Sequence, residues 1–402
     1  MSLDVVQTLV DLVRIPSVNP MGVAVDGEIY LEHRVTNYLE ELFTRLELPF
    51  ERHTVAPLRD NIIARVDGDV PPEKGGPVIM FEAHQDTVPV EGMTIDPFGA
   101  DIRDNRLYGR GSCDIKGGLA AMLAATARLA KERPRGRPTL IMACTVNEEH
   151  GFTGATHWAN TYAGGKERQG SSKLLSQVPQ AAIVAEPTRL NVVVAHKGAV
   201  RWRCHTSGVA THSSQPHLGD NAIYHMGRVL QSLETYARDV VNGLGSHPLV
   251  GGPTLSVGTI TGGIGVNTVA DRCTIQIDRR VLPGEDPQAA FDHVGEYLKA
   301  KLPKGTPVSD DVPFMMTRGL SDEHNGDLAK RLASAIQRSG GPGEHVGVPF
   351  GTDAPHYAAT GCPTVVFGPG SIDQAHTADE WLDLDQLRAA AEILYDFGRQ
   401  PW

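Results

Sequence analysis

The chain has 402 residues, of which 41% are hydrophobic and 21% are charged, a balance typical of a globular enzyme and not of a disordered or fibrous protein. Because this length exceeds what one hydrophobic core usually organises, we expect two domains. The 48 acidic and 37 basic side chains give a net charge of -11. This charge argues against a nucleic-acid partner or an anionic membrane surface, since either would require a basic face.

Cysteine usage and the N-terminal sequence point to a reducing compartment. The five cysteines are odd in number and widely spaced, and no Cys-x-x-Cys pair occurs, so neither a disulfide framework nor a thiolate zinc site is indicated. Residues 1–6 contain no basic segment, and no long apolar segment follows, so we expect no signal peptide. No stretch approaches the roughly 18 apolar residues of a membrane span. We therefore expect a cytoplasmic protein.

Helices and buried strands alternate over residues 1–187. Apolar residues recur at helical spacing near Val5–Val13 and Glu32–Leu46, and a helix rich in small residues follows at Leu119–Lys131. The apolar runs typical of strands buried on both faces are Asn61–Val66, Pro77–Glu82, Thr139–Val146 and Ala181–Ala185. We expect a surface loop at Gly164–Ser172. This alternation predicts an α/β fold whose mostly parallel central sheet is flanked by helices.

The pattern changes after Pro187 and changes back near Asp322. The elements between these points alternate as strand, helix, strand, strand, helix and strand, at Val192–His205, Asn221–Val241, Leu255–Thr261, Cys273–Val281, Pro287–Lys301 and Val308–Pro313. This order is typical of the ferredoxin-like βαββαβ unit. The last elements are Gly326–Ser339 (helix), Thr364–Phe367 (strand) and Leu384–Gly398 (helix). We therefore expect a catalytic domain of residues 1–187 and 314–402, interrupted by an inserted α+β domain of residues 188–313.

Histidine and carboxylate side chains lie at or just after the predicted strand ends. They are His84, Asp86, Asp114, Glu148, Glu149, Glu186 and His376. Ligands in an open α/β sheet bind at the carboxyl ends of its strands. Zinc binds imidazole nitrogen and carboxylate oxygen, and a catalytic zinc site keeps one position open for water. Two histidines and three carboxylates suffice for two zinc ions if one carboxylate bridges. Considered singly, each residue could instead be a turn former, a helix cap or a solvated charge.

Six motifs follow one another in a recognisable order. They are His84-Gln-Asp-Thr-Val-Pro89, Asp96-Pro-Phe98, Leu107-Tyr-Gly-Arg-Gly-Ser-Cys-Asp-Ile-Lys-Gly-Gly118, Asn147-Glu-Glu-His-Gly151, Ala185-Glu-Pro-Thr188 and Gly368-Pro-Gly-Ser-Ile-Asp-Gln-Ala-His-Thr-Ala-Asp-Glu380. Together they closely resemble the aminoacylase, acetylornithine deacetylase, succinyl-diaminopimelate desuccinylase and carboxypeptidase G family of two-zinc hydrolases. The resemblance extends over roughly residues 5–398, and its last motif is most similar to acetylornithine deacetylases.

The resemblance implies a role for each metal-type residue. Asp114 would bridge two zinc ions, for which cobalt can substitute, and two further ligands would complete each site: His84 and Glu186 at one ion, Glu149 and His376 at the other. Glu148 would be the general base. Asp86 would hold His84 in the correct tautomer, as metal-bound imidazoles require. The resemblance also implies a cis peptide bond between Asp114 and Ile115.

The resemblance also implies a homodimer that shares its active sites. His212, in Gly208-Val-Ala-Thr-His-Ser-Ser214, would reach into the neighbouring subunit and donate a hydrogen bond to the oxyanion. Asn267 and Arg280 would bind the substrate carboxylate. Arg279 and Arg280 alternate across a predicted strand, so only one of them can face the substrate; we choose Arg280, and Arg279 stays open. The turn that contains Gly351 and Thr352 offers backbone N–H groups and a hydroxyl to the same carboxylate.

The predicted function is the release of an acyl group from a small N-acyl amino acid by water activated between two zinc ions. A dipeptidase or carboxypeptidase of the same family is the alternative, since each enzyme cleaves an amide beside a recognised carboxylate. A relative that binds without catalysis would have lost a ligand or the base, and none is missing. A nucleotide-binding oxidoreductase does not fit, because Gly109-Arg-Gly111 lacks a third glycine.

Overall fold

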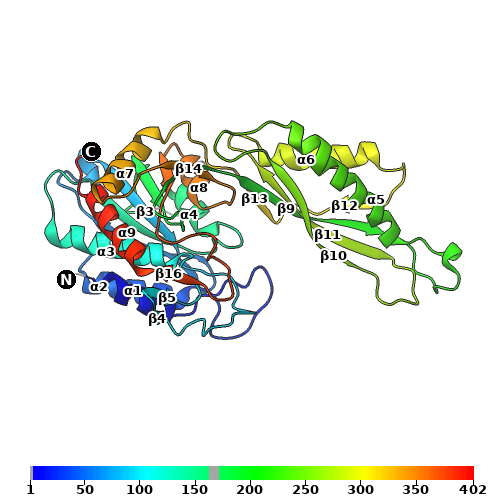
Figure 1. Cartoon of the computed structure of the whole chain (residues 1–402), viewed down its shortest axis with the longest axis horizontal. Coiled ribbons are helices and arrows are strands. Elements are labelled where there is room, and N and C mark those ends of the chain that lie inside the picture. The colour runs from blue at the N-terminus through cyan, green and yellow to red at the C-terminus, as the bar shows by residue number, and fades with distance from the viewer. Residues whose placement is uncertain (1–2, 163–171) are drawn as a thin grey trace. The chain divides into compact units, whose positions relative to one another are not determined.

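The computed structural model describes residues 3–162 and 172–402, and the chain divides into two compact units (Figure 1). The first unit consists of Met1–Val194, Asp322–Val346 and Thr352–Trp402. The second unit consists of Ala195–Ser321 and Gly347–Gly351. Of the loop expected at Gly164–Ser172, all residues except Ser172 lie outside the described part. Both ends of the chain belong to the first unit, so the second unit is inserted within it.

An eight-stranded sheet forms the centre of the first unit within the described residues, in the order β1-β2-β6-β3-β7-β15-β8-β14. These strands are β1 (Phe50–Ala56), β2 (Arg59–Val66), β3 (Val78–His84), β6 (Thr139–Thr145), β7 (Ala181–Val184), β8 (Val192–His196), β14 (His345–Val348) and β15 (Thr364–Val366). The neighbours β6, β3, β7 and β15 pair in parallel, whereas β2 pairs antiparallel with β6. The expected α/β fold with a mostly parallel core is confirmed.

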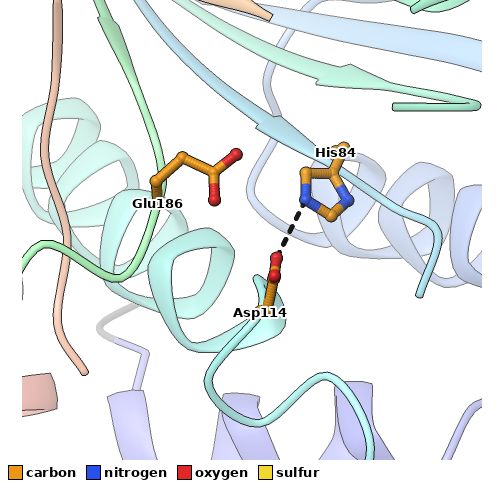
Figure 2. A group of neighbouring side chains, drawn as sticks. All are labelled: His84, Asp114 and Glu186. Carbon is orange, nitrogen blue, oxygen red and sulfur yellow. Dashed lines mark ion pairs between the residues drawn. The ribbon is translucent and has the colours of Figure 1, made fainter. Parts of the chain in front are cut away.

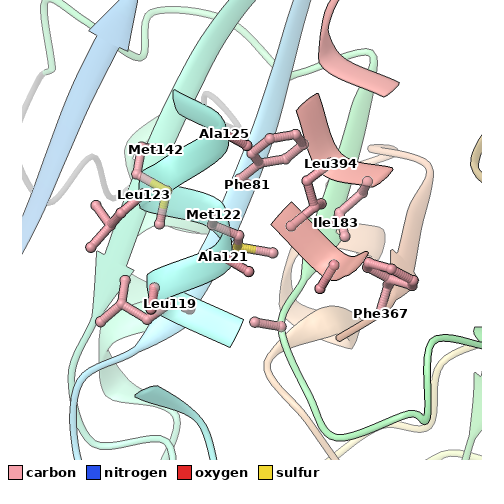
Figure 3. Packing of buried hydrophobic residues seen from close by; sticks show 14 of the residues in the cluster. Phe81, Leu119, Ala121, Met122, Leu123, Ala125, Met142, Ile183, Phe367 and Leu394 are labelled. Atoms are coloured by element: carbon pink, nitrogen blue, oxygen red, sulfur yellow. The ribbon is translucent and has the colours of Figure 1, made fainter. Parts of the chain in front are cut away.

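Helices cover both faces of this sheet. They are α1 (Val5–Val13), α2 (His33–Arg45), α3 (Lys116–Glu132), α4 (Thr153–Tyr162), α7 (Gly326–Arg338), α8 (Ala354–Ala358) and α9 (Leu384–Gly398). The main core lies between one face and α1, α2, α3, α7 and α9, and Figure 3 shows Phe81 of β3 and Leu119 of α3 within it. Successive residues of a strand point to opposite faces, so Glu82 and Phe81 lie on different sides of β3.

A small three-stranded sheet joins two distant segments of the first unit. It contains β4 (Asp101–Arg103), β5 (Arg106–Tyr108) and β16 (Trp381–Asp383), in the order β16-β5-β4. Strand β16 pairs antiparallel with β5, so that Trp381 lies opposite Tyr108. These strands were not expected from the sequence, because three residues are too short to show a periodicity. Their pairing brings residues near 110 beside residues near 380.

The second unit is an antiparallel sheet with two helices. Its strands β9 (Gly198–Ser207), β10 (Thr254–Gly262), β11 (Arg272–Val281) and β12 (Val308–Asp310) run in the order β10-β11-β9-β12, and β13 (Met315–Thr317) also pairs with β9. Burial alternates along β11, whose buried residues pack against α5 (Ala222–Thr235) and α6 (Pro287–Lys301). The expected βαββαβ order is confirmed (Figure 1).

One expected element was wrong in its extent. Residues 192–205 were expected as one long strand, but β8 ends at His196 and β9 begins at Gly198, and the two belong to different sheets. All of β8 is buried, whereas burial alternates along most of β9. The change of pattern at Lys197 therefore marks the passage between sheets. In the described part of the chain, we find no helix both long and apolar enough to cross a membrane.

We expect Phe81→Ala to lower the free energy of unfolding by about 3–5 kcal/mol, because the ring is fully buried and its removal leaves a cavity. The Phe81 ring centroid lies 6.3 Å from that of Phe397, so the loss also weakens the packing of α9. Urea unfolding followed by circular dichroism measures the change. Val70→Ala, at a residue 47% exposed, is the control and should change the free energy by less than about 0.5 kcal/mol. Equal effects of the two substitutions would contradict this account of the core.

Candidate metal centre

The expected metal ligands come from the carboxyl ends of neighbouring strands and from two loops. His84 ends β3, Glu149 follows β6, and Glu186 follows β7. Because these strands are parallel neighbours, their carboxyl ends meet at one edge of the sheet. Asp114 lies between β5 and α3, and His376 lies between β15 and β16. The peptide bond from Asp114 to Ile115 is cis, as the resemblance implied.

Two three-residue clusters share the carboxylate of Asp114. The ligand atoms of His84, Asp114 and Glu186 lie within 4.8 Å of one another, and so do those of Asp114, Glu149 and His376. Figure 2 shows the first cluster, with His84 and Glu186 directed toward Asp114. Nε2 of His84 lies 3.3 Å from Oδ1 of Asp114, and Nε2 of His376 lies 3.3 Å from Oδ2. Each oxygen of this carboxylate therefore faces a different imidazole.

Two polar atoms at the centre are poorly satisfied by the protein itself. Among the described residues, Oε1 of Glu149 is buried without a hydrogen bond, and Nε2 of His84 makes no hydrogen bond of good geometry although Oδ1 of Asp114 lies 3.3 Å away. A buried polar atom without a partner costs free energy, so such atoms indicate a group that the protein itself does not supply. Imidazole nitrogen and carboxylate oxygen are the ligands that zinc takes in catalytic sites. The residues present therefore fit two divalent cations that share Asp114.

The electrostatics of the centre also favour cations. Burial raises the pKa of the Glu148 carboxyl well above its usual range, against the effect of the His84 imidazole. Burial, together with the charge of Asp114, does the same to the pKa of Glu186. Although burial acts in the opposite direction, the imidazoles of His376 and His84 lower the pKa of Asp114. Several carboxylates thus compete for positive charge in a largely buried cluster, in which the side chain of His376 is still 52% exposed.

Asp86 contacts His84 chiefly through its main chain. Nδ1 of His84 lies 3.0 Å from the main-chain oxygen of Asp86 and 3.6 Å from Oδ1 of its carboxylate. The carboxylate instead accepts the backbone N–H groups of Glu148 and Glu149, both at 3.2 Å. It also accepts the side-chain amide of Asn19 at 2.8 Å. Asp86 therefore orients the loop that carries Glu148 and Glu149.

His212 and Asn267 lie together within the second unit. Backbone pairing places His212 opposite Thr268, and the N–H of Ser213 donates to the carbonyl of Asn267 at 3.0 Å. Nδ1 of the exposed His212 lies 2.8 Å from Oγ of Ser214. The chain therefore presents His212 and Asn267 from two adjoining loops.

Arg280 lies far from this pair in the same unit. Asn267 precedes the start of β11, whereas Arg280 lies near its end, so a strand length of about 25 Å separates them. Binding of one substrate carboxylate by Asn267 and Arg280 therefore stays a prediction. Arg279 is fully buried and paired with Glu285 at 2.6 Å, whereas the Arg280 side chain is 26% exposed and pairs with Asp278.

The expected carboxylate-binding turn spans a boundary between the units. Gly351 ends the last segment of the second unit, and Thr352 begins the return to the first. The Thr352 hydroxyl accepts the N–H of Ala354, the first residue of α8, at 3.0 Å.

Sequence reasoning assigned no role to two polar groups beside the site. Asn19 donates to Asp86 and to the side chain of Asn147, at 2.8 and 3.0 Å. Thr145 donates to Glu82 at 2.5 Å and lies 3.2 Å from Asp353, and all three side chains are buried. The sequence could have indicated a role for Glu82, because a charged residue is unusual in the otherwise apolar strand Pro77–Glu82. No sequence feature indicated a role for Asn19, because Asn before Pro is typical of a turn.

Comparisons with known proteins agree with this geometry. Residues 80–400 match the family model described as Peptidase family M20/M25/M40. The chain is 30% identical to the acetylornithine deacetylase of Pectobacterium carotovorum, over 95% of this chain and 94% of that protein. Its fold resembles that of Dug1p, a di-peptidase from Saccharomyces cerevisiae (TM-score 0.78, 14% identity, 99% and 96% of the two chains). It also resembles a dinuclear metal-binding M20 peptidase from Bacillus subtilis (TM-score 0.62, 16% identity, 98% and 96%).

We expect Asp114→Ala to weaken divalent-ion binding at both clusters, because each uses an oxygen of this carboxylate. The loss of metal affinity should exceed the roughly 10–100-fold loss that follows removal of a residue that only orients a ligand. Elemental analysis and Co²⁺ titration of the metal-stripped protein measure stoichiometry and affinity. Asp327→Ala, at an exposed carboxylate on α7, is the control. One intact high-affinity site in Asp114→Ala would rule out the shared ligand.

Proposed function

Because the chain belongs to peptidase family M20/M25/M40 and is therefore a hydrolase of amide or peptide bonds, we propose that it is a two-zinc enzyme that releases the acyl group of a small N-acyl amino acid. The observation that carries this proposal is the carboxylate of Asp114, with an imidazole 3.3 Å from each oxygen. The family assignment alone leaves the bond and the substrate open. Asp114 is shared by both ligand clusters, and the buried Glu148 belongs to neither of them. This combination favours hydrolysis by an activated water molecule, with Glu148 as its base.

Each protein group has a distinct task in this reaction. When bound, two zinc ions lower the pKa of a water molecule and polarise the scissile carbonyl. Glu148, which is not in either ligand cluster, accepts the proton of the attacking water and passes it to the departing nitrogen. Burial raises the pKa of Glu148, which makes its carboxylate a stronger acceptor in the first of these transfers. Asp86 holds the backbone of Glu148 in place through the N–H contact at 3.2 Å.

Two observations support a deacylase over a peptidase. The motif Gly368–Glu380 resembles acetylornithine deacetylases, and the curated relatives at about 30% identity carry that name. Several of the solved relatives are named as peptidases, and others are named as an aminohydrolase and an amidase, but their identities of 14–20% support the fold alone. A dipeptidase or carboxypeptidase stays the second candidate, because the same residues would serve it.

We expect the zinc- or cobalt-loaded protein to hydrolyse N-acetyl amino acids with a kcat/KM at least about ten-fold above that for dipeptides. A panel of N-acetyl, N-succinyl and N-formyl amino acids and dipeptides, assayed by release of the free amine, tests this. Preference for dipeptides would establish the second candidate, and failure to cleave any member would reject the proposal.

Two neighbouring substitutions serve as matched controls for this assay. Glu148→Gln should keep both ions and lower kcat by at least about 10²–10⁴-fold, because it removes the base. Glu149→Gln should instead weaken metal binding, since Oε2 of Glu149 lies 3.4 Å from Nε2 of His376. The reverse pattern would show that base and ligand are exchanged.

We also propose a homodimer in which His212 and Asn267 serve the partner's active site while Arg280 serves its own. The separation along β11 supports this, because one small substrate cannot reach both ends of a single strand. Strand β10 is an edge strand of its sheet, and Ile260 on it is 56% exposed. Ile264 and Val266, beside Asn267, are 88% and 102% exposed. An apolar edge of this kind is suited to a two-fold contact that covers it.

We expect activity to return when two inactive homodimers, His212→Ala and Glu148→Gln, exchange subunits. If His212 acts on the partner's site, each mixed dimer has one site with both lesions and one with neither. Activity should then approach about a quarter of wild type at equal mixing, since half of the dimers are mixed and each has one intact site of two.

Exchange must be proven independently, for example with two affinity tags purified in succession. Mixing each variant with itself is the negative control. Tagged heterodimers that stay inactive would place His212 in its own subunit's site or outside the mechanism.

A further inference from the structure

We infer that Glu380 is a positioning residue that fixes the shared ligand Asp114 relative to His376. This inference rests on the proposed two-ion site, because its consequence is the spacing between ligands of both ions. Glu380 itself touches neither cluster of ligand atoms. Its side chain is fully buried in the first unit.

Four donors surround the carboxylate of Glu380. Oε1 accepts the backbone N–H groups of Cys113 and Asp114, both at 2.9 Å. Oε2 accepts the backbone N–H of Gly111 at 3.0 Å and Nη1 of Arg110 at 2.7 Å. One buried carboxylate therefore holds the whole turn from residue 110 to residue 114, and the peptide N–H of Asp114 is among its donors.

The same residue is tied to the other ligand loop. Glu380 follows His376 by four residues, and its carbonyl accepts the N–H of Gly109 at 3.0 Å. Directly after it, β16 pairs with β5, with Trp381 opposite Tyr108. Arg110 also reaches Pro89, whose carbonyl accepts Nε at 3.1 Å. Glu380 thus connects a segment near the C-terminus to the loop that carries the shared ligand.

The donor pattern requires a carboxylate at this position. Each oxygen accepts two hydrogen bonds, and hydrogen bonds from donors to a buried charged group are stronger than those between neutral groups. A glutamine of equal size would place its amide N–H₂ against two donors, whichever way it turned. The turn would then have to shift, and Asp114 would no longer lie 3.3 Å from both imidazoles.

The test is a Co²⁺ titration of Glu380→Gln after removal of metal, followed by visible absorption and elemental analysis. We expect the affinity for at least one of two ions to fall by about 10–100-fold, the usual effect of losing a group that orients a ligand. At saturating Co²⁺, kcat should recover in part while KM stays near the wild-type value. Two ions bound with wild-type affinities would overturn the inference.

Glu51→Gln is the matched control, since Glu51 also accepts a backbone N–H and a hydroxyl, from Lys173 and Ser172, but away from the metal ligands. Its metal affinities should equal those of wild type. If Glu380→Gln does not fold, Arg110→Met removes one donor and leaves the three backbone donors, and we expect a smaller loss of affinity. Unchanged affinity in Arg110→Met would then count against the inference. If the wild-type protein binds a single ion, the proposed two-ion function is refuted. The affinity of Glu380→Gln for that ion, compared with wild type, would still test the role of Glu380.

Discussion

The structure of the metal centre depends on one carboxylate placed between two imidazoles from distant parts of the chain. His84 ends a central strand, whereas His376 lies in a loop near the C-terminus, and both are 3.3 Å from Asp114. Neither contact is local in sequence. The parallel order β6-β3-β7 supplies three ligands at one edge, and the small sheet β16-β5-β4 brings His376 to the same place. The second unit can therefore be inserted in the chain without interrupting the ligand set.

Much of the fold was predictable because the buried residues of its helices and strands recur in regular patterns along the sequence. The strands Val78–His84 and Thr139–Thr145 are buried along their whole length, and the sequence shows them as unbroken apolar runs. The passage from β8 to β9 was missed, because both strands contain apolar runs and only Lys197 separates them. The three-residue strands β4, β5 and β16 were missed because they are held by their partners and not by a pattern of their own.

The site was predictable to a different extent. The ligand residues carry recognisable motifs, and the structure brings all of them together. The supporting contacts were not predictable, since a motif does not reveal which atom of a residue makes a bond. Asp86 is the example, because its main-chain oxygen meets His84 while its carboxylate holds the Glu148 loop. Asn267 and Arg280 show the other difficulty, because their separation along β11 becomes evident only when both ends of the strand are placed.

Stability and function are coupled at this centre by unbalanced charge. Glu148, Glu186 and Asp114 are all buried, and burial acts to raise the pKa of each. Without cations, the folded state must either protonate some of these groups or tolerate their mutual repulsion, and both lower its stability. Ions that bind only the folded chain offset this cost, so their binding free energy adds to the free energy of unfolding. The contacts of the Asp86 carboxylate with the backbone N–H groups of Glu148 and Glu149 fit this account, because they fix the position of two of the crowded carboxylates.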